Sequence, residues 1–160
     1  MAFFYDNGHF CFSREQSTEE IFMLVFSVKS IYGLRAALTL AENYDQELMP
    51  IKEIAEKKHI PRQYLEQIFN QLGRAGIVQS VRGKHGGYRL AAHPSLIMVS
   101  KVIELLEGGI ELLPATNGAV DVIDDLFQAA RQRLLEVFEI SLADLVLQQQ
   151  NRLGSLHYDI

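Results

Sequence analysis

Cysteine is almost missing from this sequence, because Cys11 is the only one in 160 residues. A lone cysteine excludes a disulfide framework within the chain, and it also excludes a cysteine-rich zinc or iron–sulfur site. Apolar runs long enough to span a membrane are absent as well. Residues 1–22 contain Arg14 as their only Lys or Arg, which argues against a secretory signal. We therefore expect a cytoplasmic protein, in a bacterium, that does not bind a membrane.

Positive charge is scarce overall, since the net charge of the chain is −5. The cations that are present are concentrated in one segment. Residues 52–89 contain eight Lys or Arg and three acidic residues, a balance of +5, so the remainder of the chain is strongly acidic. This asymmetry is expected where one face meets phosphates and the rest keeps the protein soluble. Chance clustering on a solvated face gives the same count.

Three helices are predicted in the first half of the chain. Residues 1–22 have no clear period, and we expect them to form a mobile N-terminal extension. A helix follows from Ser27, its N-cap, to about Tyr44, with an inward stripe of Val28, Ile31, Leu34, Leu38 and Ala41. A short helix at 51–57 and a turn at 58–60 lead to a third helix, from Pro61 to about Ala75. The third helix is predicted to bury Leu65, Ile68, Phe69 and Leu72.

A β-hairpin and three more helices are predicted in the second half. Residues 77–81 and 88–90 are strand-like, and the glycines at 83, 86 and 87 permit a reversal between them. A helix that ends at Gly108 and a long helix at 121–138 follow, and Ser141 and Asp144 form a capping-box pattern for a last helix. The predicted organisation is an extension at 1–22, a winged helix-turn-helix domain at 23–108, a loop at 109–120, a dimerisation helix and final helix at 121–152, and a tail at 153–160.

The order of helix, short helix, turn, helix and glycine-rich hairpin is that of a winged helix-turn-helix. The predicted fold is therefore mainly α with a small β-hairpin, followed by a long C-terminal dimerisation helix. A major groove admits one α-helix, and a neighbouring hairpin can reach the adjacent minor groove. Side chains that read bases or phosphates are expected on the third helix and the hairpin: Arg62, Gln63, Tyr64, Glu66, Gln67, Asn70, Arg82, Lys84 and His85. Taken singly, each feature also fits an ordinary surface helix or turn.

The long helix at 121–138 predicts a homodimer. Its apolar stripe is wider than one small domain needs, and its members are Ile123, Phe127, Ala130, Leu134 and Val137. A helix packed within a monomer would explain the same stripe. In a dimer, two-fold symmetry would present two recognition helices to a palindromic operator in double-stranded DNA.

Several segments closely resemble the Rrf-type family of winged-helix regulators, the group that includes IscR and CymR. They lie at 24–38, 51–56, 64–68 (YLEQI), 81–90 (VRGKHGGYRL) and 141–146 (SLADLV), so the resemblance covers about residues 23–146. It implies a homodimeric DNA-binding regulator of transcription. It also implies that Tyr64, Glu66 and Gln67 lie near bases or phosphates and that Arg82 enters the minor groove.

The sequence departs from that family at its metal site. Cluster-binding members carry three closely spaced cysteines before the long helix, whereas residues 109–120 here contain none. We therefore expect no iron–sulfur cluster and no other cofactor, and the five histidines show no metal-ligand spacing. No nucleophile–base pair suggests an enzyme. The alternative to a DNA-binding regulator is a winged-helix interaction module that controls a partner protein. A small-molecule or protein effector is expected to act at the dimer region.

Overall fold

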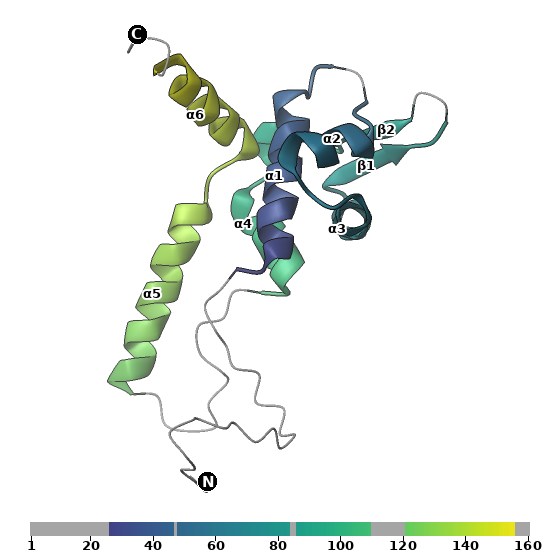
Figure 1. Cartoon of the computed structure of the whole chain (residues 1–160). Coiled ribbons are helices and arrows are strands. Elements are labelled where there is room, and N and C mark those ends of the chain that lie inside the picture. The colour runs from purple at the N-terminus through teal and green to yellow at the C-terminus, as the bar shows by residue number, and fades with distance from the viewer. Residues whose placement is uncertain (1–25, 47, 84–85, 110–120, 156–160) are drawn as a thin grey trace, which may run out of the picture.

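The computed structural model describes residues 26–46, 48–83, 86–109 and 121–155. The elements follow in the order α1 (Val28–Glu42), α2 (Ile51–Lys58), α3 (Arg62–Arg74), β1 (Val78–Val81), β2 (Gly87–Leu90), the 3-10 turn η1 (Pro94–Leu96), α4 (Val99–Glu107), α5 (Val122–Phe138) and α6 (Leu142–Ser155). α1 to α4, the hairpin and α6 form the body, and α5 projects from it (Figure 1). Within these ranges, no helix is long and apolar enough to cross a membrane.

The predicted fold class is confirmed, with a mainly α body and one two-stranded hairpin. The predicted extension at 1–22 and all but the first residue of the predicted loop at 109–120 lie outside the described residues. The last helix runs to Ser155, so the predicted boundary at 152 falls inside it.

The two helices of the helix-turn-helix end through local backbone chemistry. α2 ends where His59 adopts a left-handed conformation (φ 54°), and the N–H of Ile60 donates to the carbonyl of Ala55 at 2.9 Å. α3 ends in the same way at Gly76 (φ 71°), with Ile77 donating to Leu72 at 2.9 Å. These bonds satisfy carbonyls that a helix end would otherwise leave unpaired, so both helices stop sharply.

The core lies between α1, α2, α3 and α4. The stripe predicted for α3 is confirmed, because Leu65, Ile68, Phe69 and Leu72 are all buried. α4 in turn buries Val99, Val102, Ile103 and Leu106. The core therefore fixes which face of α3 is turned outward.

The stripe predicted for α1 is wrong for Val28 and Ile31, although Ala41 is buried and Leu34 packs against the core. Val28 and Ile31 are 58% and 40% exposed, and the residues that α1 buries are mostly small or polar: Ser30, Gly33, Ala36, Ala37, Thr39, Leu40 and Ala41. A Cβ added to Gly33 would lie 3.3 Å from Cγ2 of Ile68 on α3. The close approach of neighbouring helices leaves room only for small side chains on this face of α1. The positions of the large apolar residues therefore do not predict which residues of α1 are buried.

The hairpin is tied to the segment before α2. β1 and β2 pair in antiparallel register, with Gln79 opposite Arg89. Met49 adds a third backbone segment, since it donates to Tyr88 at 3.0 Å and accepts from Tyr88 at 2.9 Å. A Cβ on Gly87 would lie 2.7 Å from the carbonyl oxygen of Met49, so this position requires glycine. The sequence analysis did not predict the Met49 contact.

Among the described residues, α5 packs on the body through its C-terminal part. None of its residues is buried. The rings of Phe138 and Phe26 meet edge to face at 5.3 Å, and the next residue, Glu139, accepts a hydrogen bond from the Ser100 hydroxyl at 3.0 Å. At its other end, Asp121 and Asp124 form a reciprocal capping box. Among the interactions of the described residues, this capping box is therefore what stabilises the projecting N-terminal part of α5.

The predicted capping box at the start of α6 is confirmed. The Ser141 hydroxyl lies 2.6 Å from an Asp144 carboxylate oxygen, and the Asp144 N–H donates to that hydroxyl at 3.2 Å. The Asp144 carboxylate accepts hydrogen bonds from the Ser141 hydroxyl and from the Ser141 N–H, and these two bonds, the hydroxyl first, lower the pKa of Asp144. Ile140 and Leu145, on either side of the capping box, are half-buried against the core.

Candidate nucleic-acid interface

α3 presents one polar face away from the core. Four of the predicted readers are exposed on it: Arg62, Gln63, Gln67 and Asn70. Gln71 and Arg74 continue this exposed surface toward the end of the helix, although the sequence analysis did not name them. Their distance of four and seven residues from Gln67 was the available signal. The face supplies amide and guanidinium groups, which can bond to base edges and phosphates.

Arg62 and Glu66 form an ion pair on this face. The Arg62 Nε lies 3.0 Å from the Glu66 Oε1, one helical turn away, and both side chains are solvent-accessible. The pair orients the guanidinium at the start of α3. Because exposed ion pairs are weak, roughly 0–1 kcal/mol, the guanidinium can exchange the carboxylate for a phosphate at small cost.

Tyr64 lies at the edge of the polar face. It is half-buried and packs against the core, and its ring meets that of Tyr32 on α1 at a centroid distance of 6.0 Å. Of the predicted α3 readers, it is therefore the one whose side chain packs on another element of the body.

The hairpin provides the second part of the site. Arg82 is exposed where β1 has just ended, whereas the predicted Lys84 and His85 lie outside the described residues. The Arg89 Nε donates to the Gln79 side-chain oxygen across the strands at 3.1 Å. Arg89 was expected on the DNA-facing hairpin, whereas Gln79 was not, although the hairpin register places the two residues opposite each other.

α3 and the hairpin are held together as one unit. The ring of Phe69, on the inner face of α3, lies 4.6 Å from the ring of Tyr88 on β2. The turn at Gly76 joins α3 directly to β1, and Figure 1 shows the hairpin extending beside α3. The spacing between the polar face of α3 and Arg82 is thus set by packed side chains.

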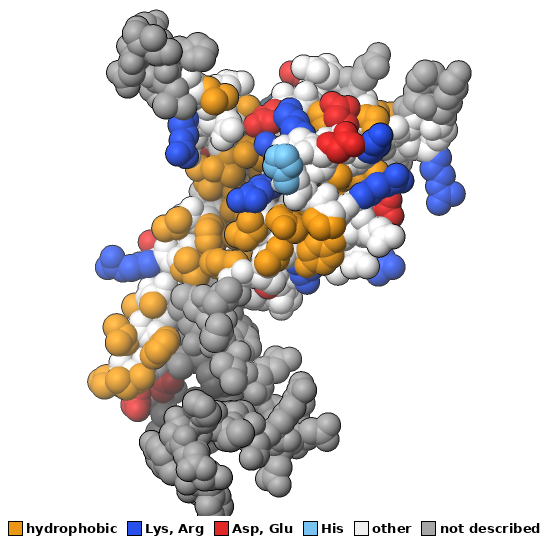
Figure 2. Space-filling view, in the orientation of Figure 1, with side chains coloured by type: hydrophobic (Ala, Val, Ile, Leu, Met, Phe, Trp, Pro, Cys, Tyr) orange, Lys and Arg blue, Asp and Glu red, His pale blue; other side chains and the backbone are white. Residues whose placement is uncertain are grey.

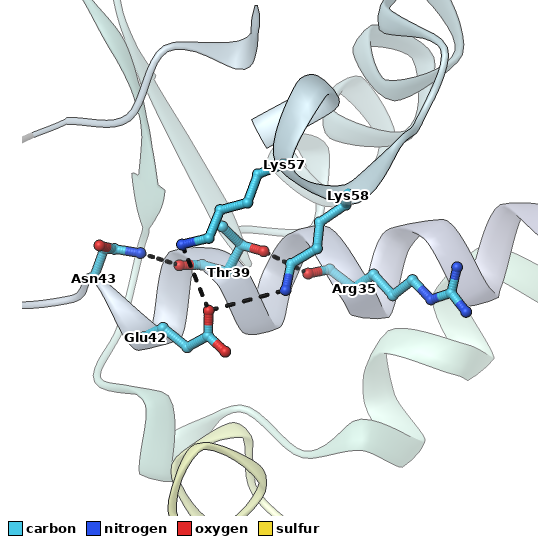
Figure 3. Close-up of polar contacts among 6 residues, drawn as sticks. All are labelled: Arg35, Thr39, Glu42, Asn43, Lys57 and Lys58. Carbon is cyan, nitrogen blue, oxygen red and sulfur yellow. Dashed lines mark hydrogen bonds and ion pairs between the residues drawn. The ribbon is translucent and has the colours of Figure 1, made fainter. Parts of the chain in front are cut away.

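Several cations of the basic segment support the helix-turn-helix. Lys57 and Lys58 each lie 4.0 Å from the Glu42 carboxylate at the end of α1 (Figure 3). They therefore hold α2 on α1. Lys52 pairs with Glu56 at 3.8 Å, beside a depression of ≈ 490 Å³ that separates α2 from the start of α3. Part of the charge excess therefore serves the fold.

Figure 2 shows Lys and Arg side chains mainly over the body, and hydrophobic side chains both along α5 and across the neighbouring lower part of the body. On α5, the predicted dimer residues Ile123, Phe127, Ala130 and Val137 are exposed, whereas Leu134 is half-buried against the core. The molecule therefore carries a polar, cationic surface at α3 and the hairpin and an apolar one on α5.

A helix-turn-helix followed by a hairpin, with a polar third helix and a cationic wing, defines a winged-helix protein of the nucleic-acid-binding class. More specifically, the chain belongs to the Rrf2 family, whose description is "Iron-dependent Transcriptional regulator" and whose model matches residues 26–148. The Rrf-type resemblance is confirmed.

Individual relatives are also named as regulators of transcription. HTH-type transcriptional regulator CymR of Bacillus subtilis is 33% identical over 111 residues, which cover 69% of this chain and 75% of that protein. HTH-type transcriptional regulator IscR of Cereibacter sphaeroides is 38% identical over 95 residues, or 58% and 61% of the two chains. The solved structure of CymR (YrzC), the global cysteine regulator of B. subtilis, matches with a TM-score of 0.74 and 32% identity, over 79% of this chain and 98% of that chain. The family and these relatives are regulators of transcription and not enzymes.

The iron named in the family description does not fit the residues of this chain as a thiolate-held cluster. Clusters of this kind are most often held by four ligands, usually thiolates, and the sequence has one cysteine. Among the residues that the structure describes, no group of three or more His, Cys, Asp or Glu side chains could hold a metal ion.

Proposed function

We propose that the protein is a cytoplasmic transcription regulator that binds double-stranded DNA directly, with α3 in the major groove and the hairpin in the adjacent minor groove. The observation that carries this proposal is the fixed placement of the polar α3 face beside Arg82, on a unit joined by Phe69 and Tyr88. An interaction module without DNA contacts would not require amides and guanidinium groups to be arranged in this way.

Gln67 tests the reading of bases. An amide can form two hydrogen bonds with adenine, so Gln67→Ala should relax the preference at one base pair of each half-site, by about 1–3 kcal/mol. Gln148→Ala, an exposed change on α6, is the matched control and should leave the preference unchanged. Affinities for a panel of single-base operator variants provide the measurement.

Arg82 tests the grip of the wing. Each phosphate contact releases counterions, so Arg82→Ala should weaken binding and lower the slope of log affinity against log salt by about one if its partner is a phosphate. Salt-dependent binding also separates a DNA regulator from the alternative, a module that acts only on a partner protein. If both Gln67→Ala and Arg82→Ala bind the wild-type site with unchanged affinity, the docking mode is wrong.

We further propose that α5 forms a homodimer and that the operator is palindromic. Val122, Ile123 and Leu126 are 78%, 52% and 63% exposed, an apolar surface that favours burial against a second copy. The acidic residues of α5 lie mainly in its first turn, and Arg131 and Arg133 lie in its second half. Two antiparallel copies that cross near Ala129 would place opposite charges together, and the small side chain would permit close approach.

We propose that this dimer binds DNA without an iron–sulfur cluster, and that a small molecule or protein at the dimer region supplies any signal. Iron and sulfide analysis and visible absorption after anaerobic purification test this directly, and we expect neither element in stoichiometric amount. Iron and sulfide that disappear on Cys11→Ser would contradict the proposal, because two copies of Cys11 would then hold a cluster between them.

A further inference from the structure

Tyr64, a side chain predicted to contact DNA, packs against Tyr32, which lies outside the helix-turn-helix. Tyr64 lies in the first turn of α3, and the N-terminal residues of a recognition helix are those that reach base edges. The ring of Tyr32, on α1, meets the Tyr64 ring edge to face, with centroids 6.0 Å apart and planes at 76°. Both side chains are half-buried and pack against the core.

The place of the Tyr32 ring is set by its neighbours. Gly33, the next residue, brings α1 so close to α3 that a Cβ there would lie 3.3 Å from Ile68. At the start of the same helix, the Ser27 N–H and hydroxyl each donate to the Glu107 carboxylate on α4 at 2.8 Å. α1 is therefore held at its N-cap, Ser27, and again beside Tyr32. The Tyr32 ring thus packs against Tyr64 from a fixed position.

We propose that Tyr32 is a positioning residue for DNA binding, which holds the Tyr64 ring in the rotamer that presents its hydroxyl to the nucleic acid. The inference rests on the proposed function, in which α3 enters the major groove. A side chain without such a support is shared among three staggered rotamers, and an edge-to-face pair is strong enough to select one of them. The loss of this selection lowers the competent fraction toward one third, and with it the affinity, by about two- to threefold.

A double-mutant cycle tests this role. The affinities of wild type, Tyr32→Ala, Tyr64→Ala and the double variant for a selected operator are measured by fluorescence anisotropy. We expect Tyr32→Ala to weaken binding about two- to threefold in the wild-type background and to leave the affinity unchanged in the Tyr64→Ala background. An equal loss in both backgrounds would overturn the inference, because Tyr32 would then act on the fold and not through Tyr64. An unchanged affinity of Tyr32→Ala would also overturn it.

Conservative and matched variants complete the design. Tyr32→Phe keeps the ring edge and should bind like wild type, and Tyr32→Leu replaces Tyr32→Ala in the cycle if the latter fails to fold. Phe26→Leu removes an edge-to-face pair with Phe138 just before the start of α1, and should leave the affinity of a pre-formed dimer unchanged. A wild-type protein that binds no DNA would refute the proposed function itself. A wild-type protein that binds while the cycle shows no coupling would refute only the role of Tyr32.

Discussion

Glu107 joins the end of α4 to the start of α1 through a charged carboxylate. Burial raises the pKa of Glu107, but the nearby Ser30 and Ser27 hydroxyls, the Ser27 N–H and the charge of Lys29 together bring it below the ordinary value of 4.5. Ser27 is the N-cap residue of α1, as predicted, but its hydroxyl donates to Glu107 and does not cap the α1 backbone. The carboxylate therefore stabilises the fold in its ionised form.

This linkage gives a pH-dependent prediction. The folded protein holds the Glu107 proton less tightly than the unfolded chain, so its contribution is fully present above the unfolded pKa and is lost as the pH falls through the folded pKa. Glu107→Gln keeps an acceptor oxygen but loses its charge, so it should lower the free energy of unfolding at pH 7 by about 1 kcal/mol, the difference between hydrogen bonds to a charged and to a neutral acceptor. Urea titrations between pH 7 and pH 3 should show that this difference in the free energy of unfolding becomes smaller below about pH 4.5.

Glu104→Gln, on the same helix, is the control for a change of charge alone, and it should not reproduce the effect. The account of Glu107 would be contradicted if Glu107→Gln followed the wild-type stability at every pH.

At the scale of elements, the hairpin depends on a backbone contact that only glycine allows. Gly87→Ala would place a methyl group 2.7 Å from the Met49 carbonyl oxygen, so the hairpin has to shift. We expect a loss of about 1–3 kcal/mol in the free energy of unfolding, as in other overpacked sites. The displaced hairpin should also bind DNA more weakly.

Gly73 offers the opposite case in the same region. It lies within α3, and the nearest atom to an added Cβ, the Val78 carbonyl oxygen, is 3.6 Å away. Gly73→Ala should therefore raise the free energy of unfolding by about 0.5–1 kcal/mol. Chemical denaturation of the two variants measures both changes in the free energy of unfolding. A Gly73→Ala protein less stable than wild type, together with a Gly87→Ala protein of unchanged stability, would contradict this description of the hairpin.

The sequence predicted those elements whose periodicity or end chemistry is local. α3, α4 and the capping box of α6 follow from apolar spacing and from Ser141 and Asp144. The buried face of α1 did not, because packing at Gly33 selects small side chains that a search for large apolar residues overlooks. The Met49 contact with Tyr88 joins positions far apart in the sequence, so no local pattern could indicate it.

The candidate site was predictable by the same logic. The exposed face of α3 follows once Leu65 and Ile68 are known to be buried, so Gln63 and Gln67 were found correctly as surface residues. The residues that pack against that face could not be predicted from the sequence. The pairing of Tyr64 with Tyr32 depends on how α1 crosses α3. The DNA contacts themselves remain predictions, and those of Lys84 and His85 concern positions outside the described residues.

At the scale of the whole molecule, α5 should determine the oligomeric state. Ile123 and Phe127 are 52% and 39% exposed and lie one turn apart, so charged replacements should disrupt a dimer without entering the core. Ile123→Glu combined with Phe127→Glu should give a monomer with an unchanged helical circular dichroism spectrum. The monomer should bind a palindromic operator weaker by roughly 10²-fold or more, because the second half-site no longer binds as part of the same molecule.

Leu96→Glu is the matched control for the dimer. This leucine is 74% exposed on η1, away from α5, and its replacement should leave the mass in solution unchanged. Light scattering on both variants provides the measurement, and a folded double variant that keeps the mass of a dimer would assign dimerisation to another surface.

Selection of bound fragments from genomic DNA by purified protein tests the central claim, sequence-specific DNA binding by a dimer, most directly. The account predicts an enriched two-fold symmetric motif whose half-sites lie about one helical turn, or a multiple of it, apart. The Gln67→Ala protein should select the same motif with lower preference at one position of each half-site. Recovery of fragments without any common motif, at a salt concentration where the protein is folded and dimeric, would contradict the claim.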